Sequence, residues 1–290
     1  MAEIRSPLII DSHCHAWAYW PYEPPVPDPE SRGTVEQLLN QMDLNGVNQA
    51  CIVSANIWHN PENNDYVARA VREHPTRLYQ FADVDSFWSN TYHKPGAAGR
   101  LDGAAEKWPM KGFTHYLASE DDGSWLTSRA GTDFFKVAEE HRLIASIACQ
   151  PHQQPALRKV AERFPSVPIL CHHMGLVKSS EPSPHRNLNE VLRSAELPNM
   201  YLKLSGFAYV SQRSWDYPFS DALWVYRVAY ERFGRRMVWG SDYPVCAFDM
   251  THRQALEAFR SHCTFVTDSD KEAILGGTLY MLLHGAKEVA

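Results

Sequence analysis

Short apolar runs alternate with amphipathic stretches along the whole chain. Eight of these runs predict strands, at residues 8–15, 48–54, 78–84, 110–117, 143–150, 167–173, 200–206 and 237–242. Between them, apolar residues recur near helical spacing, as in residues 35–44, 65–73, 133–141, 156–164 and 222–233. The predicted strands are apolar throughout, which is typical of parallel strands buried on both faces. Eight strand–helix units of this kind predict an α/β fold, the (β/α)8 barrel.

The length of the chain suits one such barrel. It has 290 residues, and a barrel of this type takes roughly 250. Because no linker, low-complexity tract or change of composition marks a boundary, we expect a single domain over residues 1–290. Two longer inserts, residues 17–29 and 85–107, follow the first and third strands. We expect both at or near the mouth of the barrel, where loops build substrate pockets.

The first insert is rich in proline and aromatic residues. It contains Trp17, Tyr19, Trp20 and Tyr22. A proline-rich loop is semi-rigid, so these rings either form a fixed wall of a substrate pocket or pack together as a cap on the barrel. The sequence favours neither alternative. Trp58, just past the second strand, poses the same choice between the pocket and packing.

Composition and charge narrow the class of partner. A net charge of -6 leaves no basic stripe, so nucleic acid is not expected as a partner. The apolar stretch at residues 8–10 is too short for a signal peptide or a membrane span, which predicts a cytoplasmic protein without membrane contact. The six cysteines form no CxxC pair and are expected to be reduced and buried. We expect a small-molecule substrate, and a homo-oligomer is compatible with the sequence.

The first strand ends in a pair of histidines. His13 and His15 are two positions apart, so both side chains lie on one side of the strand, about 6 to 7 Å apart along it. Both imidazoles can then reach one metal ion. An HxH pair alone is a weak signal, but this pair stands at the end of a barrel strand, where catalytic residues gather in this architecture.

Three later strands also end in polar residues. His152 follows the fifth strand and could supply a third nitrogen. The sixth strand ends in His172 and His173, whose side chains should point to opposite faces; we assign His173 to the site and expect His172 to face the helices or the rim in a hydrogen-bonded structural role. Asp242 ends the eighth strand, where a carboxylate can bind a metal and accept a proton.

These residues lie in motifs that resemble the amidohydrolase-related branch of the amidohydrolase superfamily. The motifs are IDSHCHAW, HHMG, MYLKLSG and VWGSDYPV, and ILGGTLYMLL resembles the closing helix of that family. The resemblance covers nearly the whole chain. Its members include sugar lactonases similar to fuconolactonase, pyrone-dicarboxylate lactonase and non-oxidative aromatic decarboxylases. The KLSG element, Lys203 to Gly206, looks more like the lactonases.

The resemblance implies one divalent metal ion at the mouth of the barrel. It implies His13, His15, His152 and Asp242 as metal ligands and His173 as a catalytic group near the metal. Three nitrogens and a carboxylate suit zinc or manganese. Candidate substrate-binding residues are Trp17, Tyr19, Trp58, His115 and Lys203.

The chain also departs from the family. The glycine-rich fourth strand often carries an arginine for an acidic substrate, whereas Gly112 to His115 offers none at the matching place. Arg100, Arg129 or Lys203 would have to serve instead.

The expected chemistry is hydrolysis. A divalent ion lowers the pKa of its bound water from about 15.7 to about 7. Asp242 would take the water proton and return it to the leaving alkoxide, while His173 orients the water or stabilises the oxyanion. We therefore expect a metal-dependent lactonase that opens a small sugar-like or carboxylated lactone. The alternatives are a non-oxidative decarboxylase of a hydroxylated aromatic acid at the same metal site, and a catalytically silent barrel that binds a ligand.

Overall fold

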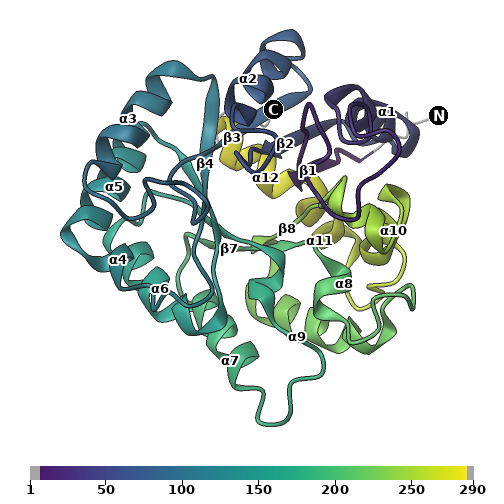
Figure 1. The fold of residues 1–290 in the computed structure, drawn as a ribbon. Helices are drawn as coiled ribbons and strands as arrows, with labels where there is room; N and C mark the ends of the chain where they lie inside the picture. Colours follow the sequence, from purple (N-terminus) through teal and green to yellow (C-terminus); the bar gives the residue numbers. More distant parts are fainter. Residues whose placement is uncertain (1–6, 286–290) are drawn as a thin grey trace.

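A computed structural model describes residues 7–285, and its centre is a sheet of eight parallel strands in chain order. Helices surround this sheet on the outside (Figure 1). The strands are β1 (Ile10–Cys14), β2 (Gln49–Val53), β3 (Leu78–Asp83), β4 (Met110–Tyr116), β5 (Ile144–Ala148), β6 (Ile169–Cys171), β7 (Met200–Leu204) and β8 (Met237–Trp239). Each lies within one of the eight predicted ranges. The predicted (β/α)8 barrel is confirmed.

The five predicted helices correspond to α1 (Val35–Asn45), α2 (Asn63–Glu73), α5 (Arg129–Glu140), α6 (Gln154–Arg163) and α9 (Leu223–Phe233). Each buries one face, as α1 does with Val35, Leu38 and Met42. The other α-helices are α3 (Ala97–Lys107), α4 (Ser124–Thr127), α7 (Arg186–Arg193), α8 (Phe207–Val210), α10 (His252–Arg260), α11 (Asp268–Glu272) and α12 (Thr278–His284).

The prediction that residues 85–107 form a loop insert is wrong for its second half. That half is α3, an ordinary crossover helix between β3 and β4. Its buried face consists of Ala97, Leu101 and Ala104, so the apolar stripe is made mostly of alanine. Two glycines inside the helix weaken the helical signal further, because glycine is a poor helix former. Only residues 85–96 remain as a loop above β3.

The barrel interior is apolar at its N-terminal end. Ile10, Tyr79 and Val238, near the starts of their strands, belong to one interior cluster, and Leu279 and Leu283 of α12 pack against it. Figure 1 shows α12 lying across the barrel. Because α12 closes the N-terminal end, the C-terminal end is the one left open for a site.

Backbone hydrogen bonds join the first and last strands beyond their ends. The Asp242 N–H donates to the His13 carbonyl at 2.7 Å, and the His15 N–H donates to the Tyr243 carbonyl at 2.6 Å. Oδ1 of the buried Asp11 accepts from the backbone N–H groups of His13 and Ser241, each at 3.0 Å. These bonds hold the end of β1 against the segment that carries Asp242.

Within residues 7–285, no helix has both the length and the hydropathy that a membrane crossing requires. The six cysteines are buried and free, in agreement with the prediction.

Candidate active site

A β-bulge in β1 directs His13 and His15 into the barrel. The pairing of β1 with β2 shifts register between Asp11 and Cys14. Ile10 faces the interior, and the bulge lets His13, three positions later, face it as well. The two Nε2 atoms of His13 and His15 then lie 3.2 Å apart. A β-carbon at Gly240 would lie 2.8 Å from the His13 Cβ, so this approach of β8 to β1 requires glycine.

Asp242 meets these two histidines from the other side. Its Oδ1 lies 3.5 Å from Nε2 of His13 and 3.4 Å from Nε2 of His15. The residue is buried and has a φ of +59°, a left-handed conformation that costs strain in a residue other than glycine. The bond from its N–H to the His13 carbonyl holds it there. The structure thus brings the residues at the ends of β1 and β8 together, as predicted.

His173 completes the cluster through a left-handed turn. Its φ is +44°, and its Nε2 lies 4.0 Å from Oδ1 of Asp242, while its Nδ1 lies 3.0 Å from the Ser205 hydroxyl. A β-carbon at Gly206 would lie 3.0 Å from that Nδ1 and 2.4 Å from Cδ2 of Tyr209. Gly206 therefore lets His173 and Tyr209 come together.

His172 does not face the helices or the rim, as we expected from strand alternation. It is buried, its ring centroid lies 4.5 Å from that of His13, and its Nε2 lies 2.6 Å from the Ser146 hydroxyl. His172 continues the inward phase of Leu170. The positive φ of His173 then turns the next side chain inward too, which is why both histidines reach the interior.

Lys203 lies beneath the cluster, not in solvent or in the substrate pocket. It is fully buried, with Nζ 2.7 Å from the Ser146 hydroxyl, 3.0 Å from Nδ1 of His13 and 5.5 Å from the centre of the Phe81 ring. These side chains come from β1, β3, β5 and β7, as in the interior layers of such barrels. Burial lowers the pKa of Lys203 to about 7.

Burial and neighbouring charges shift the pKa values of the cluster residues. Burial, followed by the charge of Lys203, lowers the pKa of His13 well below its ordinary value. Burial lowers the pKa of His173 to about 4, against the opposing charge of Asp242. Burial alone would raise the pKa of Asp242, but His173, His15 and Tyr209 outweigh it and the pKa is lowered. Neutral imidazoles and an ionised carboxylate are the forms that bind metal.

The donor set fits a divalent metal ion. One ligand atom from each of His13, His15 and Asp242 lies within 4.8 Å of the others. Nδ1 of His15 lies 2.7 Å from the Val53 carbonyl, which can only accept, so Nδ1 carries the hydrogen and Nε2 presents its lone pair. His13, His15 and Asp242 would therefore hold the ion, at the end of the barrel where the cavity opens.

The structure does not bring His152 to this cluster. Its side chain is exposed, and its Nε2 lies 2.9 Å from the Asp121 carbonyl. Residues Pro151–Gln153 form a 3-10 turn directly after β5. In this turn Pro151 and Gln153 are buried, Gln153 donates to the carbonyls of Ala118 and Asp121, and His152 points away. The third predicted nitrogen ligand is thus not at the site.

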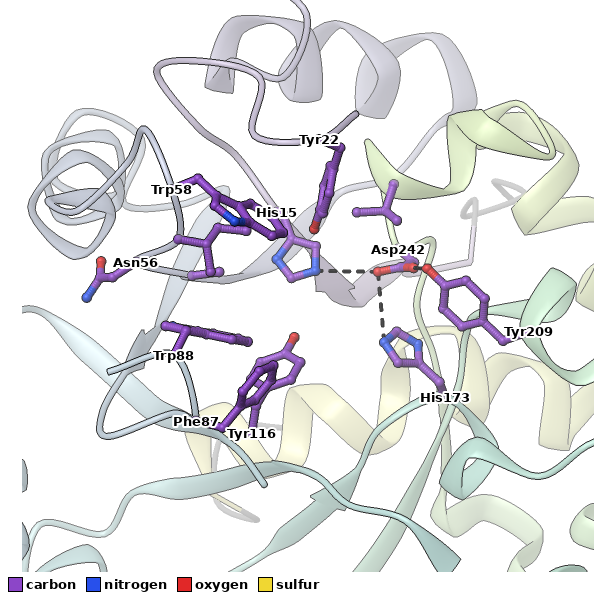
Figure 2. A pocket seen from close by; sticks show the side chains of 13 residues that line it. His15, Tyr22, Asn56, Trp58, Phe87, Trp88, Tyr116, His173, Tyr209 and Asp242 are labelled. Carbon is purple, nitrogen blue, oxygen red and sulfur yellow. Dashed lines mark hydrogen bonds and ion pairs between the residues drawn. The ribbon is translucent and has the colours of Figure 1, made fainter. Parts of the chain in front are cut away.

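A cavity of about 590 Å³ opens beside the cluster (Figure 2). Its polar end consists of His15, His173 and Asp242. The rest is mainly aromatic and apolar; the lining side chains are Tyr22, Ala55, Asn56, Ile57, Trp58, Phe87, Trp88, Tyr116, Tyr209 and Val245. Loops after β1, β2, β3, β7 and β8 and the end of β4 contribute these residues, which is the usual origin of a pocket in this fold.

Of the five predicted substrate-binding residues, only Trp58 lines this cavity. Trp17 is buried and stacks on His15 at a centroid distance of 4.9 Å, so it supports a cluster residue from behind. Tyr19 is exposed and packs against His59. His115 points outward from β4 between Trp125 and Phe134, because Tyr116 takes the inward position.

The aromatic insert after β1 contributes both to packing and to the wall of the cavity. Trp17 and Trp20 are packing residues, whereas Tyr22 is part of the cavity wall.

Sequence reasoning missed the residue in closest contact with Asp242. Tyr209 follows β7, and its hydroxyl donates to Oδ2 of Asp242 at 2.6 Å. It also missed Phe87, Trp88 and Tyr116 in the cavity wall. All four lie at or just after the C-terminal end of a strand, and that position was the available signal.

Comparisons with known proteins find a matching family and similar solved structures. A sequence model of a family described as amidohydrolase matches residues 10–279. No curated protein matches the sequence. A solved structure of an amidohydrolase from Burkholderia multivorans with bound zinc is similar, with 19% sequence identity, a TM-score of 0.75, and coverage of 95% of this chain and 99% of that one.

Two further solved structures share the fold. One is a probable 2-pyrone-4,6-dicarboxylic acid hydrolase from Acinetobacter baumannii with citric acid bound: 19% identity, TM-score 0.73, coverage of 95% of this chain and 98% of the other. The other is 5-carboxyvanillate decarboxylase from Novosphingobium aromaticivorans with manganese and 4-hydroxy-3-methoxy-5-nitrobenzoic acid: 13% identity, TM-score 0.62, coverage of 96% of each chain.

Proposed function

The chain belongs to the amidohydrolase family, and on that premise we propose that it is a metal-dependent hydrolase that opens a small lactone. The observation that carries this proposal is the position of Asp242. Its carboxylate lies among three imidazoles and faces a cavity large enough for a small ligand. An ionised carboxylate in that place is suited to take a proton from water and return it to a leaving oxygen.

A bound divalent ion would supply Lewis acidity toward a carbonyl oxygen and acidify water at neutral pH. We propose zinc or manganese, held by His13, His15 and Asp242, because imidazole and carboxylate donors suit both. Asp242 accepts the proton of the attacking water and passes it to the oxygen of the opened ring. His173, with Nδ1 at the Ser205 hydroxyl, directs Nε2 toward the same place and stabilises negative charge on the carbonyl oxygen.

Decarboxylation of a hydroxylated aromatic acid is the second candidate, and the aromatic cavity wall favours it. One of the similar structures is named as such an enzyme, whereas another is named as a lactone-opening pyrone hydrolase. Decarboxylation requires Asp242 to hold a proton for delivery to a ring carbon. Asp242 lies among three imidazoles and accepts a hydrogen bond from Tyr209; these contacts favour its ionised form, and we therefore prefer hydrolysis.

The test follows two products in parallel. Purified protein, with its metal measured, is incubated with a panel of lactones and of hydroxybenzoates, while acid release and carbon dioxide release are recorded. We expect acid release from at least one lactone, absent in the Asp242→Asn variant. Carbon dioxide release without lactone opening would replace the proposal by the second candidate. No turnover of either class would favour a barrel that only binds a ligand.

A further inference from the structure

We propose that the preferred substrate is an uncharged lactone fused to, or conjugated with, an aromatic ring. This inference rests on the proposed lactone hydrolysis and narrows its substrate class. It departs from the sugar-like or carboxylated lactone expected from the sequence. The side chains that line the cavity, and the ion pairs and hydrogen bonds that the nearest cationic side chains already make, favour such a substrate.

Two aromatic walls enclose the space beside the cluster. Figure 2 shows Tyr22 and Trp58 on one side of this space and Trp88 and Tyr116 on the other. Within the walls, the ring centroids of Tyr22 and Trp58 are 5.6 Å apart, and those of Trp88 and Tyr116 are 4.7 Å apart. Faces and edges of this kind bind another flat ring in stacked or edge-to-face contact. A planar bicyclic ligand suits a slot between them.

No arginine or lysine in residues 7–285 lines this cavity. Arg100 is bound to Asp85, with its Nη2 2.6 Å from Oδ2, and Arg129 is 97% exposed beside Asp133. Lys203 donates to Ser146 in the layer below. A carboxylate on the substrate would therefore enter a mainly apolar slot without a cationic side chain to pair with, at a high desolvation cost. The charge of a bound metal would be engaged by the carbonyl that reacts.

The cavity also has few partners for the hydroxyl groups of a sugar. Outside the histidine–aspartate cluster, its polar side chains are Asn56 and the three tyrosines, and the Tyr209 hydroxyl is already bonded to Asp242. Burial raises the pKa values of Tyr22 and Tyr116, so both phenols remain donors. The two phenols and the Asn56 amide are too few to satisfy the hydroxyl groups of a polyhydroxylated ring.

The reaction on such a substrate balances with water alone. The water oxygen forms a bond to the carbonyl carbon, and the bond from that carbon to the ring oxygen breaks. One water proton passes through Asp242 to the departing ring oxygen, which is a phenolate oxygen when it is attached to the aromatic ring. The other is released as the new carboxylic acid ionises at neutral pH. A phenol leaves more readily than an alkoxide, so less proton transfer is required of Asp242 than with an aliphatic lactone.

The experiment compares four lactones on the metal-loaded protein. They are 3,4-dihydrocoumarin, δ-valerolactone, D-glucono-1,5-lactone and 2-pyrone-4,6-dicarboxylate. Rates are corrected for spontaneous opening, because an aryl ester is intrinsically more reactive. We expect corrected kcat/KM for dihydrocoumarin to exceed that of the other three by about tenfold or more, mainly through a lower KM. Equal or faster opening of the sugar lactone or the dicarboxylate would overturn the inference while leaving lactone hydrolysis intact.

A binding measurement separates the substrate class from the chemistry. The dissociation constant of 4-chromanone, a neutral bicyclic ketone without an ester bond, is compared with that of isophthalate by calorimetry. Tighter binding of chromanone supports the inference, and tighter binding of isophthalate contradicts it. If chromanone binds but no lactone is opened, the proposed hydrolysis fails while the preference for an uncharged aromatic ligand stands.

Two variants and a control test whether the aromatic walls determine substrate preference. Trp58→Ala removes a ring that is 68% exposed, so the fold should tolerate it, and KM should rise about tenfold for dihydrocoumarin and by less for δ-valerolactone. Trp215→Ala, at a residue that is 80% exposed and outside the cavity, is the matched control. Phe87→Arg places a cation at the half-exposed rim and should improve opening of the dicarboxylate. Unchanged KM in Trp58→Ala would count against the walls as the binding surface.

Discussion

The Tyr209 hydroxyl donates a 2.6 Å hydrogen bond to Oδ2 of Asp242, while Oδ1 of the same carboxylate faces the imidazoles. The two oxygens of Asp242 thus have different partners. One is held in place by a neutral donor, and the other is directed at the candidate metal site. Tyr209 is in this sense a positioning residue, since it acts through the carboxylate that it orients.

Replacing Tyr209 with phenylalanine should change the pH profile as well as the rate. The Tyr209 bond is one of the interactions that lower the pKa of Asp242, so its loss raises that pKa. The acid limb of kcat/KM should move to higher pH, and kcat should fall about tenfold. Tyr230→Phe is the control, because Tyr230 makes the same kind of bond, 2.6 Å to Asp270, on a different part of the molecule. An unshifted acid limb would remove Tyr209 from this role.

Asp242→Asn should abolish turnover without unfolding the protein. Asparagine tolerates the positive φ of this position and keeps the shape of the side chain, but it cannot accept the proton. We expect kcat to fall by about 10³-fold or more. Circular dichroism and thermal unfolding of the metal-free protein check the fold, and Asp249→Asn, at an exposed residue of the same loop, serves for comparison. Near-normal kcat in Asp242→Asn would exclude the proton-transfer role.

Metal content should depend on His13 and His15 but not on His152. Dialysis against a chelator should remove activity, and zinc or manganese should restore it. His13→Ala and His15→Ala should each lose most of the bound metal in elemental analysis, because each removes a donor from the cluster. His152→Ala should retain it, since that side chain is exposed and bonded to the Asp121 carbonyl. Loss of metal in His152→Ala would show that the loop rearranges to bring this histidine in.

Stability should rise with pH because of Lys203. Its pKa is about 7 in the folded protein, lowered by burial from an ordinary value of 10.5. Between these values the unfolded chain binds more protons, so the free energy of unfolding increases with pH by up to about 1.4 kcal/mol per pH unit. Lys203→Met lacks this contribution.

Urea unfolding of the metal-free protein at pH 7 and pH 9 tests this dependence. The stability of wild type relative to Lys203→Met should increase by about 2 kcal/mol between the two pH values. Lys159→Met, at an exposed lysine of α6, should show no such pH-dependent difference from wild type. A gap that stays constant with pH would mean that Lys203 keeps its charge in the folded state.

Local sequence patterns were sufficient to predict the barrel and the centre of its candidate site. Continuous apolar runs and helical spacing are local patterns, and they placed all eight strands and five of the helices. The C-terminal ends of parallel strands meet at one end of a barrel. This rule alone predicts that His13, His15 and Asp242 lie close together. Helix α3 was not predicted, because alanine and glycine contribute little to the helical spacing of apolar residues.

The tertiary structure decided which side chains at the strand ends enter the site. The 3-10 turn at Pro151 sends His152 outward, and the positive φ of His173 turns that residue inward beside His172. Packing across the barrel decided that Lys203 meets His13 and that Tyr209 meets Asp242. Sequence periodicity specifies the face of a regular element, but it is lost at the first irregular turn. Beyond that turn, contacts between residues distant in sequence determine the direction of each side chain.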